Sequence, residues 1–279
     1  MKKRRELANR FQGETLVRKS MKYGSEVLSQ VRIAPDLNVV KIGGHGTVDF
    51  GSEVLLPLLE EITGLAKTHP MLLVVGGGVR VRHVMDVGID LGMPTGILSE
   101  LSGQISKQNA MMVATLLSDC GGVQISPDDI MDIPMLMKMG LIPVMPGTPP
   151  YGLFEEPTKG SMIPQHRTDT GAYLAAEVLG AKSCILVKNV DGLFAENPFV
   201  NPDADLIADI TACELLDLNL DDMVLERKVV ELLPSSKNIR AVRVINGHVP
   251  GTLTKALAGE DVGTIIRAEQ SSLLRPSNI

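Results

Sequence analysis

The sequence contains few aromatic residues and few cysteines. It has no Trp, 3% aromatic residues and three cysteines among 279 residues. The cysteines are odd in number, widely scattered and without metal-ligand spacing, which argues against a disulfide framework and a zinc site. No apolar run approaches the roughly 20 residues of a membrane-spanning helix, and no apolar segment follows the basic N-terminus, as it would in a secretory signal. We therefore expect a cytoplasmic protein with no membrane partner.

Three widespread motifs are also missing. The chain has no G-x-x-x-x-G-K-[ST], no G-x-G-x-x-G after an apolar strand and no H-E-x-x-H. These absences argue against a P-loop, a Rossmann dinucleotide site and a zinc peptidase. We assign no metal ligand, because His45, His83 and His166 are isolated and lone histidines are usually ordinary hydrogen-bonded residues. The net charge of −6 argues against a nucleic-acid partner.

The charge is distributed unevenly along the chain. Through Lys22 there are eight Lys or Arg residues against two Glu residues, a local charge of +6. Two interpretations remain open: a solvated arm, or an arm that docks on an acidic neighbouring subunit. We predict an N-terminal arm over residues 1–34, a nucleotide-binding domain over 35–268 and a tail over 269–279.

Hydrophobic residues make up 44% of the chain, and they occur in short continuous runs that alternate with helical patterns. Continuous apolar strands indicate a sheet covered on both faces, and their alternation with helices indicates βαβ units. The sequence therefore predicts an α/β fold with a mostly parallel sheet. The predicted strands are 38–42, 71–75, 141–145, 184–187, 242–245 and 264–266. Two predicted helices begin near residues 52 and 80, and three more span 104–117, 169–179 and 225–233.

Glycine-rich segments follow three of these strands. They contain Gly43 and Gly44, then Gly76, Gly77 and Gly78, then Gly147 between Pro146 and Thr148. Ligands of open α/β sheets bind beyond the carboxyl ends of the strands, where glycines let backbone N–H groups approach an anion. Any one segment alone is better explained as a tight turn. The three together, with a lysine in the first, favour a phosphate cradle.

Lysines and an aspartate lie beside these segments. Lys41 ends the first strand, Lys188 ends another, and Asp169 begins a helix. A buried lysine needs a compensating charge, and phosphoryl transfer needs cations held on phosphate oxygens. We therefore predict Lys41, Asp169 and Lys188 as catalytic residues, although Asp169 and Thr168 are also typical helix N-caps. The predicted binding residues are Gly43, Gly44, Gly76, Gly77, Gly78, Arg80, Thr168, Asn189, Asp191 and Gly192.

Several segments resemble a known family. Residues 41–44, 76–78, 168–170, 190–194 and 263–265 are similar to the uridylate kinase branch of the amino acid kinase family. The resemblance runs from about Ile33 to Arg267. Four segments are more similar to members of that family that store oxometalate instead of phosphorylating a metabolite, namely 78–83, 149–151, 163–171 and 246–264.

The resemblance implies a three-layer αβα sandwich that binds ATP and Mg²⁺ at the strand ends, with Lys41 and Lys188 at phosphate positions. It further implies a hexamer of two related subunit types, in which ATP hydrolysis loads molybdate or tungstate into polyoxometalate clusters and the basic arm wraps a neighbour. One subunit type in that group has cluster-binding histidines after Pro-Pro-Tyr, whereas this chain reads Gly-Leu-Phe-Glu-Glu over 152–156. The chain thus resembles the histidine-poor type, or a relative that stores no metal.

Two further functions stay open from the sequence. The paired lysines and Asp169 also fit a small-molecule phosphotransferase with uridylate as its acceptor. The third alternative is a subunit that binds nucleotide and assembles without turnover.

Overall fold

The computed structural model describes residues 30–147, 149–158, 162–220 and 222–268. The predicted tail and nearly all of the predicted arm lie outside these residues. The chain divides into Met1–Val31 and Arg32–Ile279, and the fold described below belongs to the second unit.

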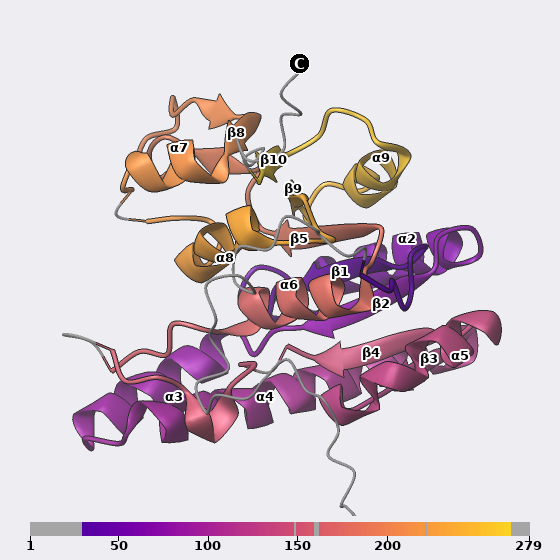
Figure 1. Ribbon diagram of the computed structural model, residues 1–279, viewed down its shortest axis with the longest axis horizontal. Coiled ribbons are helices and arrows are strands. Elements are labelled where there is room, and N and C mark those ends of the chain that lie inside the picture. Colours follow the sequence, from indigo (N-terminus) through magenta and orange to yellow (C-terminus); the bar gives the residue numbers. More distant parts are fainter. Residues whose placement is uncertain (1–29, 148, 159–161, 221, 269–279) are drawn as a thin grey trace, which may run out of the picture. The chain divides into compact units, whose positions relative to one another are not determined.

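An eight-stranded sheet forms the centre of this unit (Figure 1). Its strand order is β3-β4-β2-β1-β5-β9-β10-β8, and β10 runs antiparallel to β9 whereas every other neighbouring pair is parallel. The predicted mostly parallel α/β sheet is therefore confirmed. The strands are β1 (Asn38–Ile42), β2 (Met71–Val75), β3 (Gly122–Gln124), β4 (Ile142–Pro146), β5 (Ser183–Lys188), β8 (Asp209–Thr211), β9 (Ala241–Asn246) and β10 (Thr264–Arg267). A separate two-stranded sheet pairs β6 (Leu193–Phe194) with β7 (Leu206–Ile207).

Helices cover both faces of the sheet, and successive strand residues contribute to opposite faces. In β1, Val39 belongs to one buried cluster, and Val40 and Ile42 belong to the other. The first cluster includes residues of α5 (Ile133–Lys138), α6 (Thr168–Leu179), α7 (Ala212–Asp217) and α8 (Arg227–Leu232). The second includes residues of α2 (Leu55–Ala66), α4 (Thr95–Leu116) and α9 (Thr252–Ala258). This arrangement is the expected three-layer αβα sandwich.

Two helix boundaries matter for the cavity described below. Helix α3 (Val79–Asp90) begins directly after the glycines that follow β2, and α6 begins at Thr168 and lies over β1 (Figure 1). Both helices therefore present their amino-terminal ends at the carboxyl edge of the parallel strands. No helix within the described part of the chain is long and apolar enough to cross a membrane.

Candidate nucleotide site

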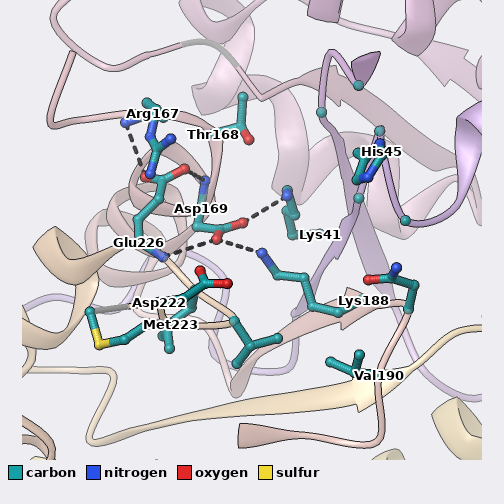
Figure 2. A pocket seen from close by; sticks show the side chains of 18 of the residues that line it. Lys41, His45, Arg167, Thr168, Asp169, Lys188, Val190, Asp222, Met223 and Glu226 are labelled. Carbon is teal, nitrogen blue, oxygen red and sulfur yellow. Dashed lines mark hydrogen bonds and ion pairs between the residues drawn. The ribbon is translucent and has the colours of Figure 1, made fainter. Parts of the chain in front are cut away.

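A cavity of about 490 Å³ opens at the carboxyl ends of β1, β2 and β5 (Figure 2). All three predicted catalytic residues line it, and so do eight of the ten predicted binding residues. Further lining comes from residues 222–226, which precede α8, and from Phe194 and residues 196–199. The structure thus brings stretches that are far apart in the sequence to the edge of the sheet where ligands of open α/β folds bind.

Asp169 lies between the two lysines in this cavity (Figure 2). Its Oδ1 is 2.7 Å from Lys41 Nζ, and its Oδ2 accepts a hydrogen bond from Lys188 Nζ at 2.7 Å. The side chains of Asp169 and Lys41 are 3% and 6% exposed, and that of Lys188 is 16% exposed. These three groups therefore form a buried cluster with one surplus positive charge.

The charges in this cluster determine its protonation. Burial by itself would raise the pKa of Asp169, but the charges and hydrogen bonds of Lys188 and Lys41 outweigh burial and hold that pKa well below its usual range. Burial also lowers the pKa of Lys188 below its usual 10.5, while the charge of Asp169 opposes this shift. Asp169 is consequently a carboxylate at neutral pH, in contact with both lysine side chains at the cavity.

Glu226 fixes the helix end that carries Asp169, and sequence reasoning missed it. Its carboxylate accepts hydrogen bonds from the backbone N–H groups of Arg167, Asp169 and Thr170 at 2.8–3.0 Å, and from the Thr170 hydroxyl at 2.7 Å. In return, the Glu226 N–H donates to Asp169 Oδ2 at 3.3 Å. This buried carboxylate caps α6 from a distant part of the chain and complements the positive end of the helix.

Replacing Glu226 with glutamine is expected to lower the free energy of unfolding by about 2–3 kcal/mol, because a neutral side chain with one acceptor oxygen replaces a charged acceptor for four donors. Urea denaturation measures this change. Glu231→Gln is the matched control, since Glu231 makes only 3.3–3.5 Å surface ion pairs and its side chain is 40% exposed. We expect less than about 0.5 kcal/mol there. Equal effects of the two substitutions would contradict the capping role.

The first two glycine segments pack against each other. A Cβ on Gly44 would clash with the backbone of Gly78, and it would lie 2.8 Å from the carbonyl oxygen of Gly76. A Cβ on Gly76 would lie 3.0 Å from the backbone nitrogen of Gly44 and 3.5 Å from Lys41 Nζ. Glycine is therefore required at both positions for backbone contact, and this contact brings the two loops together beside the lysine.

Two predicted binding residues lie away from the cavity lining. Arg80 turns toward α4, where its guanidinium donates to the side-chain oxygens of Gln108 and Asn109. The Asp191 carboxylate instead accepts a hydrogen bond from Asn246 Nδ2 at 2.8 Å. Arg82, two residues further along α3, does line the cavity. Thr148 of the third glycine segment lies outside the described residues, while its neighbour Pro149 is part of the lining.

His166 forms a buried contact with Glu155. Its Nδ1 lies 2.8 Å from Glu155 Oε1, and its ring meets Tyr151 edge-on at a centroid distance of 4.5 Å. Both His166 and Glu155 are buried. The pair connects Glu155, in the stretch 152–156 that contains no histidine, to the residues just before α6.

The residues present fit a polyphosphate ligand. Two ammonium groups and the glycine backbones converge on one side of the cavity, and such groups bind phosphate oxygens. Among the described residues, no cluster of three or more His, Cys, Asp or Glu side chains could hold a metal ion. This donor set suits Mg²⁺ that arrives with the phosphates, because Mg²⁺ retains several waters and usually takes only one or two protein carboxylates.

The parallel sheet, the glycine loops and the lysine pair define an α/β protein with a glycine-rich, lysine-lined cavity at its strand ends. The chain belongs to the amino acid kinase family, whose model matches residues 36–246. In solved structures, UMP kinase from Bacillus anthracis superposes with a TM-score of 0.67 at 19% identity, covering 87% of this chain and 100% of that one. At that level of identity, the match supports the fold alone.

Two relatives extend the comparison. The chain is 38% identical to molybdenum storage protein subunit beta of Azotobacter vinelandii, over 94% of this chain and 97% of that protein. It is 30% identical to uridylate kinase of Methanocaldococcus jannaschii, over 71% of this chain and 83% of that enzyme. The expected resemblance to a storage member of the family is therefore confirmed by the match to a molybdenum storage protein subunit.

Proposed function

We propose that this chain is the nucleotide-binding subunit of a molybdenum or tungsten storage assembly, in which ATP hydrolysis with Mg²⁺ loads oxometalate into clusters. The observation that carries the proposal is the buried pair of lysines on Asp169 at the edge of the glycine loops. The 38% identity to a molybdenum storage protein subunit, over almost the whole chain, supports the cargo. The same relative is a beta subunit, which supports a sister subunit as partner, and we propose a hexamer as the assembly.

Each lysine keeps hydrogen-bonding capacity for the nucleotide. An ammonium group has three donors, and Asp169 takes one from each lysine, so the remaining N–H groups of Lys41 and Lys188 can donate to the β- and γ-phosphate oxygens. Asp169 holds the two cations at fixed positions before the nucleotide binds. Such preorganised charge stabilises the charge that develops on the phosphate oxygens in the transition state.

Hydrolysis then needs no covalent group from the protein. The bond between the γ-phosphorus and the bridging oxygen breaks, a water oxygen bonds to phosphorus, and the proton of the water is released to solvent. ADP leaves with the bridging oxygen. Mg²⁺, when bound, neutralises charge on the β- and γ-phosphates, and the exposed carboxylates of Asp222 and Glu196, which line the cavity, would hold it.

Elemental analysis tests the storage function. The full-length chain is produced alone and with a sister subunit, in medium with excess molybdate or tungstate, and purified with ATP and Mg²⁺. We expect tens of metal atoms per assembly, and less than a tenth of that amount in a Lys41→Ala assembly. Lys182→Ala is the control, because Lys182 is exposed at the opposite end of β5 from Lys188. A metal-free assembly in every combination would overturn the proposal.

A uridylate kinase-like phosphotransferase is the second candidate, favoured by the 30% identity to an archaeal uridylate kinase. Incubation with γ-labelled ATP and uridine monophosphate distinguishes the two functions. Label transferred to the nucleotide would support the kinase, and label recovered only as inorganic phosphate would exclude it. ATP binding without release of phosphate would instead indicate a subunit that assembles without turnover.

A further inference from the structure

A carboxylate of the chain itself closes the amino-terminal end of α3. The Asp49 Oδ2 atom accepts a hydrogen bond from the Val79 N–H at 2.6 Å. The glycine-rich loop after β1 places Asp49 there, since the Asp49 N–H donates to the carbonyl oxygen of Gly44 at 2.9 Å. A Cβ added to Gly78 would clash with the Asp49 carboxylate. Asp49 is thus built into the junction of the two glycine segments.

This position is where an anionic ligand would otherwise be stabilised. The first N–H groups of an α-helix and its dipole favour negative charge, and α3 is twelve residues long and begins at the cavity lining. Here the negative charge comes from Asp49. His45 Nδ1 lies 3.9 Å from its Oδ2.

The two sides of the cavity carry different side chains. On the α6 side, Lys41 and Lys188 share Asp169, while the Glu226 carboxylate, which also lines the cavity, is taken up by N–H groups of α6. On the α3 side, the Asp49 carboxylate lies beside Gly78, which lines the cavity. The ionisable side chains that α3 and the loop after β1 contribute to the cavity lining are Arg82 and His45. Removal of the Asp49 charge would therefore leave no carboxylate from these two segments beside that lining.

We infer that Asp49 is a specificity-determining residue that excludes a phosphorylated acceptor from the α3 side of the cavity. This inference rests on the proposal that the Lys41 and Lys188 side binds the ATP phosphates. A second phosphate, such as that of a nucleoside monophosphate, would lie close to the Asp49 carboxylate behind Gly78, and it would find the Val79 N–H already bonded. Water carries no charge, so the Asp49 carboxylate does not repel it, and it does not need the helix end as a binding group. Asp49 therefore directs the site toward hydrolysis of ATP and away from phosphorylation of a nucleotide.

The test compares binding of uridine monophosphate and uridine to the full-length chain by isothermal titration, with a non-hydrolysable ATP analogue present. Asp49→Asn keeps the shape and an acceptor oxygen for Val79 while removing the charge, and Asp49→Ser is a second neutral cap. Asp86→Asn is the matched control, since it removes a charge from an exposed position of α3 beyond its first turn. We expect both Asp49 variants to bind uridine monophosphate at least about tenfold more tightly than wild type, equivalent to about 1.4 kcal/mol. Uridine should bind all four proteins equally.

Three results would overturn the inference. The first is a wild-type dissociation constant for uridine monophosphate well below about 1 mM, the upper end of ordinary substrate affinities. The second is a folded Asp49 variant that gains no affinity, and the third is an equal gain in Asp86→Asn. The wild-type titration decides the matter even if both Asp49 variants fail to fold. Failure of the ATP analogue to bind wild type would instead refute the proposed nucleotide site, on which this inference rests, whereas the three results above count against the role of Asp49 alone.

Discussion

Asp169→Asn is expected to lower the free energy of unfolding by about 3–5 kcal/mol at neutral pH. The substitution leaves two buried lysines without their shared carboxylate, and removing one partner of a buried ion pair costs about this much. The three groups lie within 2.7 Å contacts and are at most 16% exposed, so solvent cannot replace the lost charge. Urea denaturation measures the loss. ATP hydrolysis should fall at least about a hundredfold, because the cations lose their fixed positions.

The pH dependence of this difference checks its electrostatic origin. The pKa of Asp169 is lowered in the folded state, so its charge stabilises the protein above the unfolded value of 3.8, and this stabilisation is lost as the pH falls toward the folded value. The gap in unfolding free energy between wild type and Asp169→Asn should therefore shrink as the pH falls below about 3.8. A gap that is constant between pH 7 and pH 3 would contradict the charge argument.

The sheet could be predicted because its strands are buried on both faces. Every residue of β1 and β2 is buried, and such continuous apolar runs stand out from the surrounding sequence. The short strands β3 and β8 were not predicted, since three residues carry too little pattern to recognise. Helix α4 begins at Thr95, whereas the sequence predicted a start at Gln104. Small polar residues such as Ser99 and Ser102 face its buried side, and these interrupt the apolar periodicity.

The candidate site could be predicted only in part, for a related reason. Lys41, Asp169 and Lys188 follow strands or begin a helix, so the α/β pattern places them at one edge of the sheet. Glu226 and Asp49 accept hydrogen bonds from the N–H groups of Asp169 and Val79, which lie 57 and 30 residues away in the sequence. Such remote caps have no fixed spacing, in contrast to a local capping box. The three-dimensional fold alone identifies their partners.

Lys41→Ala is expected to weaken ATP binding by about 10- to 100-fold while changing the unfolding free energy less than Asp169→Asn does. Each charge-assisted hydrogen bond to phosphate contributes about 1.5–3 kcal/mol, which corresponds to this range of dissociation constants. Fold stability is less affected, because Asp169 keeps its 2.7 Å contact with Lys188 and the buried pair becomes neutral. Isothermal titration with an ATP analogue measures the affinity, and urea denaturation measures the stability.

The control for this substitution is Lys182→Ala, which removes an exposed lysine that directly precedes β5. Unchanged ATP affinity in Lys41→Ala, with the fold intact, would mean that the glycines serve only as turns and that the lysine pair is a structural element. A loss of ATP affinity in Lys41→Ala but not in Lys182→Ala would instead separate phosphate binding by the cluster from its contribution to fold stability. Asp169 would then be the residue on which the fold depends, and the ammonium groups it holds would be the part that binds phosphate.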